Sequence, residues 1–581
     1  MIIHNKQHRS PIYQLCIGPT LILLLLVFNQ QIRAESISSG LNNILLKLGD
    51  KKVIVRKSAI IALASYDHLG LADLMEAFKR RQLYIWTKSD TSSRLIFCDS
   101  IGGARVYPKN PLTQERLKNS RGQEFQVSPN VLRQIRPARS ERGLAENVRS
   151  LLKLSSPDLD KQLSGIKKCG EAKTIKGLGQ LTDLALTKLD QISHGKSVNL
   201  SKKARRLAHE SALLIRITKT PARTGATHIQ LVVDLGKTKS QRSLKFLEKA
   251  LATLEQDPEL DEEIRRVYQA AIAKINTYQN FISLTSNLFQ GISLSSVLIL
   301  MALGLAITFG LMGVINMAHG ELMMIGAYTT YLTQQVFNHS PEMPNDVYFI
   351  FALPASFLMA ATVGFLMEFL VVRHLYKRPL ESLLATWGIG LILIQLVRLR
   401  FGDNIGVNAP SWGRGGIEIV QDLIFPYGRC FIIAICIFSV TSIYYLMRST
   451  QVGLMMRATM QNREMASGLG VNTDFVDRCT FAFGSGIAGV AGYAWTLIGG
   501  VTPNMGQTNF IVDSFLVVVT GGVGEIIGVI CAGIGIGSLT KTIEPSIGTI
   551  WAKILLLVAV VIFIQFKPSG LFAPKGRLAD D

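Results

Sequence analysis

Long uncharged runs dominate the second half of the chain. Residues 275–320 contain no Asp, Glu, Lys or Arg, and comparable runs follow at 347–367, 382–397, 430–447, 479–512, 526–540 and 554–566. So many uncharged segments are typical of a polytopic membrane protein rather than of one with a single anchor. We predict helical membrane segments at about 288–313, 318–337, 347–372, 380–399, 426–447, 479–500, 510–522, 525–540 and 547–566.

Charge placement predicts how these segments are oriented. If the first segment enters from outside, the inside regions are 373–379, 448–478 and the tail 567–581. They hold ten of the sixteen Lys and Arg residues of 284–581, whereas the predicted outside loops 338–346 and 501–509 hold none. Because basic loops stay in the cytoplasm, we expect the C-terminus to be cytoplasmic.

A cytoplasmic C-terminus requires an odd number of crossings. The number is odd if residues 510–540 are split at Gly521-Gly522-Val523-Gly524 into a half-helix and a full helix. Broken helices are tolerated at membrane depth where they line a cavity. The alternative is one kinked helix, eight crossings and a tail on the outside.

Residues 1–34 have the layout of a secretory signal peptide. A basic start at 4–9 precedes an apolar run at 17–28, and Ile32-Arg33-Ala34 is a candidate cleavage site. An uncleaved signal anchor is the alternative. Either reading places the region 35–283 outside the cytoplasm.

The region 35–283 has mostly helical periodicity, for example at Leu71, Leu74 and Phe78. Helix pairs at a spacing of roughly 40 residues favour an α-solenoid of the HEAT type. A strand hairpin is predicted at 83–86 and 94–98. The predicted fold class is therefore all-α, with a helical extracytoplasmic domain at 35–283 and a polytopic membrane domain with broken or re-entrant helices at 284–581.

The basic excess of the chain belongs to its first half. Residues 35–283 hold 43 basic and 25 acidic side chains, a net charge of +18, whereas 284–581 holds 16 of each. An anionic partner or an acidic lipid surface would fit this charge, and a solvated basic scaffold is the alternative. Nucleic acid is not expected outside the cytoplasm. Cys98 and Cys169 could form a disulfide there, but the sequence does not show their separation.

Composition and motifs exclude several classes of function. With 48% hydrophobic and 18% charged residues, the chain is neither disordered nor an ordinary soluble enzyme. It contains no Gly-x-x-x-x-Gly-Lys-[Ser/Thr], no His-Glu-x-x-His and no paired Cys-x-x-Cys. We therefore predict no catalytic residue, metal site or cofactor in this chain, and we do not expect it to be an enzyme.

A polar segment, Gly-Leu-Met-Gly-Val-Ile-Asn-Met-Ala-His-Gly-Glu at 310–321, interrupts the first uncharged run. Polar and ionisable groups are costly at such depth, so Asn316, His319 and Glu321 are candidate residues of a translocation pathway, or they tie helix ends together. The segment resembles the branched-chain amino acid permease family of ABC importers. Met317 stands where that family often has Phe.

The inside region 448–478 also resembles this family, in which it forms a short helix that docks onto the ATPase subunit. A loop of about 30 residues is long enough to have a structure and a partner of its own. The resemblance implies docking residues at Arg457, Asn462, Arg463, Glu464 and Gly470.

Small residues at a period of four follow this region, at Gly484, Ala488 and Gly492. Such spacing lets helix backbones approach closely, so helix packing is a sufficient role for them.

Three further segments resemble the urea-type permease subunits of this family: Thr-Pro-Asn-Met-Gly-Gln at 502–507, Ile-Val-Asp-Ser-Phe at 511–515 and Gly521–Gly524. Ala-Thr-Trp-Gly at 385–388 and Lys-Pro-Ser-Gly-Leu-Phe at 567–572 are similar to the same subunits, and so is an exported extension of this size. The amides of Asn504 and Gln507 could hydrogen-bond a small neutral solute. The candidate pathway residues of these segments are Trp387, Asn504, Gln507 and Asp513.

The resemblance implies a subunit of a urea importer in the bacterial inner membrane. Its partners would be a second homologous permease, two cytoplasmic ATPases that use the ATP, a periplasmic binding protein and the lipid bilayer. Three alternatives remain: the same fold importing branched-chain amino acids or short amides, a passive urea channel, and a membrane-anchored interaction protein whose exported domain carries the function.

Overall fold

The computed structural model describes residues 40–66, 68, 70–87, 93–98, 106–118, 123–195, 201–220, 225–256, 262–339, 346–376 and 378–572. The chain divides into two compact units, Met1–Thr277 and Tyr278–Asp581. The predicted signal peptide at 1–34 and the tail residues Lys575 and Arg577 lie outside the described residues.

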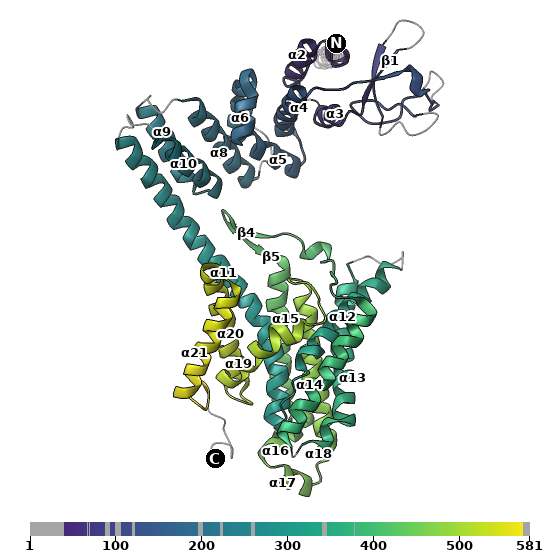
Figure 1. The fold of residues 1–581 in the computed structure, drawn as a ribbon, viewed down its shortest axis with the longest axis vertical. Helices are drawn as coiled ribbons and strands as arrows, with labels where there is room; N and C mark the ends of the chain where they lie inside the picture. Colours follow the sequence, from purple (N-terminus) through teal and green to yellow (C-terminus); the bar gives the residue numbers. More distant parts are fainter. Residues whose placement is uncertain are drawn as a thin grey trace, which may run out of the picture. The chain divides into compact units, whose positions relative to one another are not determined.

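The N-terminal unit is mostly helical, as its periodicity predicted (Figure 1). Its helices are α2 (Val53–Leu63), α3 (Leu71–Lys79), α4 (Arg139–Leu152), α5 (Leu159–Cys169), α6 (Ala172–Leu178), α7 (Thr182–Ser193), α8 (Lys202–Lys219), α9 (Ala226–Thr238) and α10 (Gln241–Leu254). One continuous cluster of buried apolar residues runs through them, because each helix presents one apolar face to its neighbours. A regular HEAT-type repeat stays a prediction.

A small antiparallel sheet belongs to the same unit. It orders β1 (Leu83–Thr87), β2 (Ser93–Phe97) and β3 (Leu132–Gln134) as β2-β1-β3, so the predicted hairpin is confirmed. The sequence did not reveal β3, because three residues are too few to show an alternating pattern. Among the described residues, Cys98 and Cys169 are not joined by a disulfide; they lie in separate apolar clusters.

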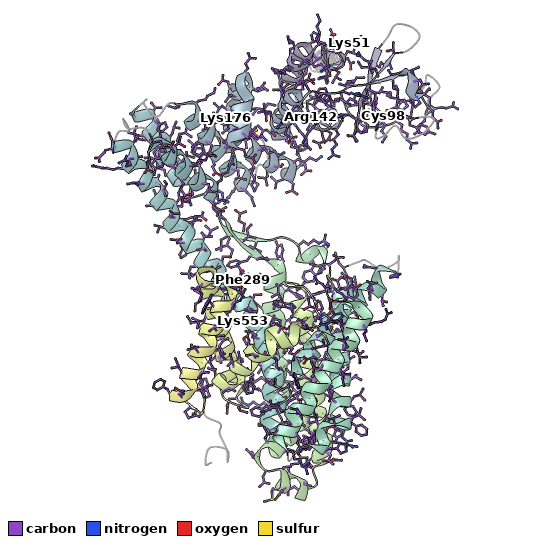
Figure 2. All side chains as sticks on the ribbon, viewed as in Figure 1. Lys51, Cys98, Arg142, Lys176, Phe289 and Lys553 are labelled. Carbon is purple, nitrogen blue, oxygen red and sulfur yellow. The ribbon has the colours of Figure 1, made fainter. Side chains whose placement is uncertain are left out.

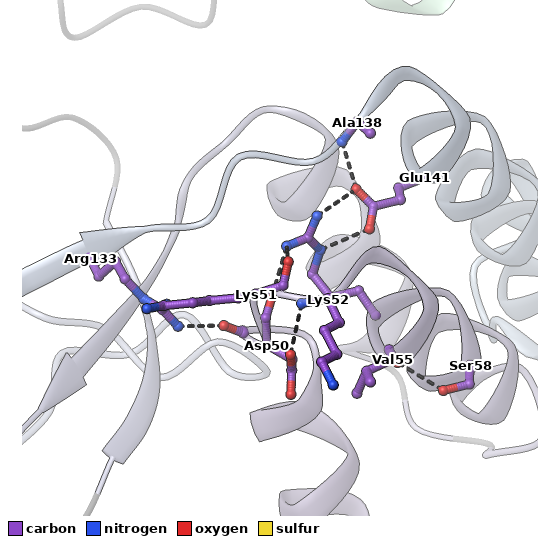
Figure 3. A network of polar contacts seen from close by, with 10 residues as sticks. Asp50, Lys51, Lys52, Val55, Ser58, Arg133, Ala138 and Glu141 are labelled. Carbon is purple, nitrogen blue, oxygen red and sulfur yellow. Dashed lines mark hydrogen bonds and ion pairs between the residues drawn. The ribbon is translucent and has the colours of Figure 1, made fainter.

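A buried ion pair fastens α2 to the start of α4 (Figure 3). The Arg56 guanidinium donates from Nε and Nη2 to the two carboxylate oxygens of Glu141, at 2.8 and 3.0 Å. Glu141 also accepts from the Ala138 backbone N–H at 2.6 Å, and Arg56 Nη1 donates to the Asp50 carbonyl at 2.8 Å. Every charged group of this contact therefore has a hydrogen-bond partner, which a buried charge requires.

The second unit contains a helix at each predicted membrane segment. They are α11 (Glu262–Met312), α12 (His319–Asn338), α13 (Tyr348–Leu370), α14 (Pro379–Phe401), α15 (Tyr427–Ser449), α18 (Thr473–Trp495), α19 (Ile511–Gly521), α20 (Ile526–Ile547) and α21 (Thr549–Phe566). In the described part of the chain, six of these are long and apolar enough to cross a membrane: α11, α13, α14, α15, α20 and α21. The helices α12 and α18 are more polar and pack against each other and against α13.

The helix α11 is longer than predicted. The sequence predicted a membrane segment that begins only near 288, but α11 begins at Glu262 and runs unbroken over 51 residues. It continues because neither Gly nor Pro lies between Glu262 and Gln290 to interrupt the backbone. A hairpin of β4 (Gly416–Val420) and β5 (Leu423–Pro426) packs on it, with the Phe425 ring stacked on Phe289 at 4.0 Å (Phe289 is labelled in Figure 2).

The predicted split of 510–540 is present. The half-helix α19 ends at Gly521 and α20 begins at Ile526, and the turn between them has Gly522 and Gly524 at φ 103° and 83°. Such angles favour glycine strongly. The two helices pack closely, since a Cβ on Gly521 would lie 2.6 Å from the backbone of Gly528.

Candidate functional site

The polar segment at 313–318 separates α11 from α12 and is not helical. The Asn316 side-chain oxygen accepts from the Ala318 N–H at 3.0 Å, which folds the segment into a tight turn before α12 begins. The His319 Nε2 lies 3.0 Å from the carbonyl oxygen of Met301 on α11. The structure therefore places Asn316 and His319 together at a break between two interior helices.

Glu321 completes this group on the first turn of α12. Asn316, His319 and Glu321 are each at most 2% exposed. Among the described residues, their Nδ2, Nδ1 and Oε2 atoms have no hydrogen-bond partner. An unsatisfied buried polar group costs about 1–3 kcal/mol, so three within six consecutive residues suggest a role beyond packing.

The helix α14 covers the break. Its Thr386 hydroxyl oxygen accepts from the Met317 N–H at 3.2 Å. A Cβ on Gly390, one turn further on, would lie 3.2 Å from the Glu321 carboxyl carbon. Thr386 and Gly390 were not predicted as site residues. The signal was available: Ser382, Thr386 and Gly390 repeat every four residues on an otherwise apolar helix, and all three are buried.

The predicted segment at 502–507 also lies beside the break. Residues Gly506–Phe510 form a π-helix, an arrangement often found at functional sites. Gly506 meets Gly320 backbone to backbone, since a Cβ on Gly506 would lie 2.0 Å from the Gly320 carbonyl oxygen. The Asn504 amide oxygen accepts from Arg398 of α14 at 3.0 Å. Gln507 is half-buried in the π-helix.

Two other predicted pathway residues lie elsewhere. Trp387 is exposed on α14, although its neighbour Thr386 is buried. Asp513 lies on α19 and faces Lys553 of α21 across 3.8 Å (Lys553 is labelled in Figure 2).

The region 448–478 folds into two short helices, α16 (Gln451–Gln461) and α17 (Arg463–Gly468). We call residues 451–472 the two-helix segment. Asn462 caps α17 by accepting from the Met465 N–H at 2.9 Å. After α17 ends, Gly470 adopts a left-handed backbone conformation at φ 89°. Met465 and Leu469 are 62% and 80% exposed. Exposed apolar side chains beside a charged helix are typical of a surface that binds another protein.

The other predicted residues of the segment differ in their surroundings. Arg457 donates from Nε to the Gly453 carbonyl within α16 at 3.4 Å. Glu464 lies in the first turn of α17, where the positive end of the helix dipole stabilises a carboxylate. Arg463 turns inward and forms an ion pair with Asp477 at 2.6 Å.

The small residues of α18 lie at close contacts with other helices. A Cβ on Gly484 would lie 2.7 Å from the Gly304 carbonyl oxygen on α11, and one on Gly492 would lie 1.9 Å from the Met323 carbonyl oxygen on α12. Ala488 between them is fully buried. Close approach of this kind leaves no room for larger side chains.

A helical bundle with broken helices and buried polar groups is typical of polytopic membrane transport proteins. Residues 287–565 match the family model described as branched-chain amino acid transport system / permease component. Over these residues the chain is therefore similar to the permease components of this family.

Several relatives are similar to about half of the chain. The high-affinity branched-chain amino acid transport system permease protein LivH of Salmonella typhimurium is 25% identical over 300 residues, covering 50% of this chain and 96% of the relative. BraD of Pseudomonas aeruginosa, described in the same words, is 23% identical and covers 49% and 94%. A probable LivH of Methanocaldococcus jannaschii is 24% identical and covers 48% and 89%. No solved structure matches the chain.

Proposed function

We propose that this chain is a membrane subunit of an ATP-driven importer, and that the break at 313–321 forms part of its translocation pathway. The observation that supports this most is the group of buried polar atoms without partners on Asn316, His319 and Glu321. A pathway for a polar solute needs such groups inside an apolar bundle. The glycine contact between 320 and 506 keeps the pathway narrow.

The proposed assembly contains a second homologous permease, two cytoplasmic ATPases and a periplasmic solute-binding protein, in a bacterial inner membrane. The region 35–283 lies outside and the C-terminus inside. The two-helix segment binds an ATPase, which supplies the hydrolysis that this chain lacks. The match of residues 287–565 to a permease-component family supports this division of labour.

A matched pair of variants tests the docking surface. Leu469→Glu places a charge on the exposed end of the two-helix segment, whereas Ile417→Glu places one on the exposed β4–β5 hairpin. We expect the ATPases to co-purify with the Ile417 variant and not with the Leu469 variant. Equal co-purification of both would show that the ATPase binds elsewhere.

We propose urea as the cargo. The sequences at 502–507 and 511–515 resemble those of urea-type subunits. The 502–507 segment also lies beside the polar break. Urea is small, planar and neutral, so amides and buried hydroxyls can bind it without a charged partner. Branched-chain amino acids are the second candidate, supported by what the names of the LivH and BraD relatives say of those proteins.

Uptake by the complete complex distinguishes these cargoes. Labelled urea should accumulate in an ATP-dependent manner, with competition by acetamide at most partial and none by leucine. Competition by leucine, together with uptake of labelled leucine, would instead assign the amino acids. Urea entry that persists after energy depletion would indicate a passive channel and would contradict an importer.

A further inference from the structure

A cluster of charged and aromatic side chains joins the two-helix segment to two interior helices. Arg463, the first residue of α17, lies with Nη2 2.6 Å from Asp477 Oδ2 on α18. Its guanidinium also lies over the Tyr376 ring, 5.2 Å from the centroid. One side chain of the exposed segment therefore contacts both α18 and the turn that follows α13.

The cluster continues into α13. The Tyr376 hydroxyl donates to Glu368 Oε1 at 2.5 Å, and Arg478 Nε lies 3.6 Å from Glu368 Oε2. Arg478 in turn lies over the Phe369 ring at 5.3 Å. The whole cluster thus links the ends of α13 and α18, which pack against each other and against α12, the helix that carries Glu321.

The burial of the two carboxylates makes this link strong. Asp477 and Glu368 are at most 1% exposed, whereas the Arg463 side chain is 41% exposed. A buried carboxylate that loses its cation is strongly unfavourable, so α17 cannot move away from α18 without a large penalty. Movement of the segment must therefore either carry α18 with it or break the pair.

We propose that Arg463 and Asp477 form the coupling contact through which the two-helix segment moves α18 and, through Tyr376 and Glu368, α13. Arg463 and Asp477 act as positioning residues: neither needs to contact solute or nucleotide. The inference rests on the proposed function, in which an ATPase binds this segment.

The experiment uses the complete transporter in proteoliposomes, with urea and leucine as alternative labelled solutes. The variants are Arg463→Gln, Asp477→Asn, Tyr376→Phe and the double exchange Arg463→Asp with Asp477→Arg. Arg448→Gln is the control, because Arg448 is an exposed arginine whose contact is local, with Tyr444 on α15. ATPase co-purification, ATP hydrolysis and solute moved per ATP are measured for each, together with thermal unfolding.

We expect Asp477→Asn, a change on α18 outside the two-helix segment, to retain the ATPases and ATP hydrolysis but to move about tenfold less solute per ATP, a typical size for coupling between sites. Arg463→Gln should show a similar loss of solute moved per ATP. The double exchange should recover part of that loss, and the control should behave as the wild type. Tyr376→Phe keeps the ring and removes the hydroxyl, so it should show a smaller loss even if Asp477→Asn does not fold.

Two results would overturn the proposal. Solute moved per ATP could stay unchanged in Arg463→Gln and Tyr376→Phe, which would show that the cluster only packs. The ATPases could instead dissociate from Asp477→Asn, which would make the pair a support for the docking surface. A wild-type complex without any bound ATPase would refute the proposed function itself. That result does not depend on the variants, so the two failures can be told apart.

Discussion

Gly320 and Gly506 allow two backbones to meet at the polar break, and no other residue type fits there. A Cβ on Gly506 would lie 2.0 Å from the Gly320 carbonyl oxygen and 2.2 Å from its carbon. Backbone atoms cannot move aside as a flexible side chain can. The contact therefore fixes how the 502–510 segment sits against Asn316, His319 and Glu321.

The first prediction follows from this contact. Gly506→Ala should destabilise the membrane unit by about 1–3 kcal/mol, as overpacking of a filled core does, and should strongly reduce transport. Gly388→Ala is the matched control, because no atom lies within 4 Å of the Cβ it would add. Thermal unfolding in detergent and solute uptake check both variants. Wild-type stability of Gly506→Ala would contradict the close contact.

A second residue-scale prediction concerns Glu146 in the N-terminal unit. Burial raises the pKa of this carboxyl, but hydrogen bonds from Lys168 and Lys79 outweigh burial and lower the pKa from 4.5 to about 2. A carboxyl with a lowered pKa stabilises the folded state above its unfolded-state pKa, and that stability is lost as the pH falls from about 4.5 to about 2.

The Glu146→Gln variant should accordingly lose stability at pH 7 and approach the wild type as the pH falls through that window. The measurement is the unfolding temperature of the full chain in detergent between pH 7 and pH 3. Asp183→Asn removes an exposed ion pair with Lys219 and serves as the control, with little expected effect. A constant difference between Glu146→Gln and the wild type at every pH would contradict the assigned pKa.

Part of the candidate site could be predicted from the sequence, but its long-range contacts could not. Asn316, His319 and Glu321 were predictable because polar groups are rare and costly within an apolar run. The pairing of Asn504 with Arg398 was not, since 106 residues separate them and both lie in segments with several possible neighbours. A periodic pattern tells which face of α14 is buried, but not which helix covers it.

At the scale of elements, the break between α19 and α20 is held by the chain that follows α21. Leu571 donates from its N–H to the Thr520 carbonyl at 2.8 Å, and Phe572 donates to the Gly521 carbonyl at 3.4 Å. Both acceptors belong to the last turn of α19, where helix carbonyls lack partners within the helix. The segment 567–572 therefore caps the half-helix from outside it.

This cap gives the third prediction, tested with two truncations. Ending the chain after Phe572 keeps both hydrogen bonds, whereas ending it after Phe566 removes them. We expect the shorter protein to unfold several degrees lower, because two carbonyls lose their donors at about 1 kcal/mol each. Size-exclusion chromatography and thermal unfolding in detergent compare the pair. Equal unfolding temperatures would show that the cap does not stabilise α19.

The elements were largely predictable because apolar runs mark membrane helices by length alone. What the runs could not give was the structure of the polar connections. The region 448–478 contains α16 and α17, whose caps at Thr450 and Asn462 are single residues within a mixed sequence. The unbroken length of α11 was equally hidden, because a change from charged to apolar residues resembles a boundary even where the backbone continues.

At the scale of the second unit, the two-helix segment and the segment 567–572 share one face. Gly310, near the end of α11, lies against Gly524 of the α19–α20 break and near Met460 of α16. Gly522 of the same break lies against Phe572. The helix α15 extends over 23 residues, about 34 Å, from the end of the β4–β5 hairpin to the start of α16 in the two-helix segment. That length spans a hydrocarbon core of about 30 Å, so the hairpin lies on the opposite face.

The last prediction is the topology that this arrangement requires together with the positive-inside rule. Green fluorescent protein, which does not become fluorescent after export through the general secretion route, should fluoresce when fused after Phe572. Alkaline phosphatase, which is active only outside the cytoplasm, should be active when fused after Val420 in the hairpin and inactive after Phe572. Uptake by the protein fused after Phe572 establishes that this fusion is folded.

Active phosphatase after Phe572 would place the segment 567–572 and the two-helix segment outside together, because the contacts through Gly524 and Gly522 do not allow them to separate. An ATPase in the cytoplasm could then not reach Leu469, so one measurement of sidedness tests the odd number of crossings and the docking of the ATPase at once.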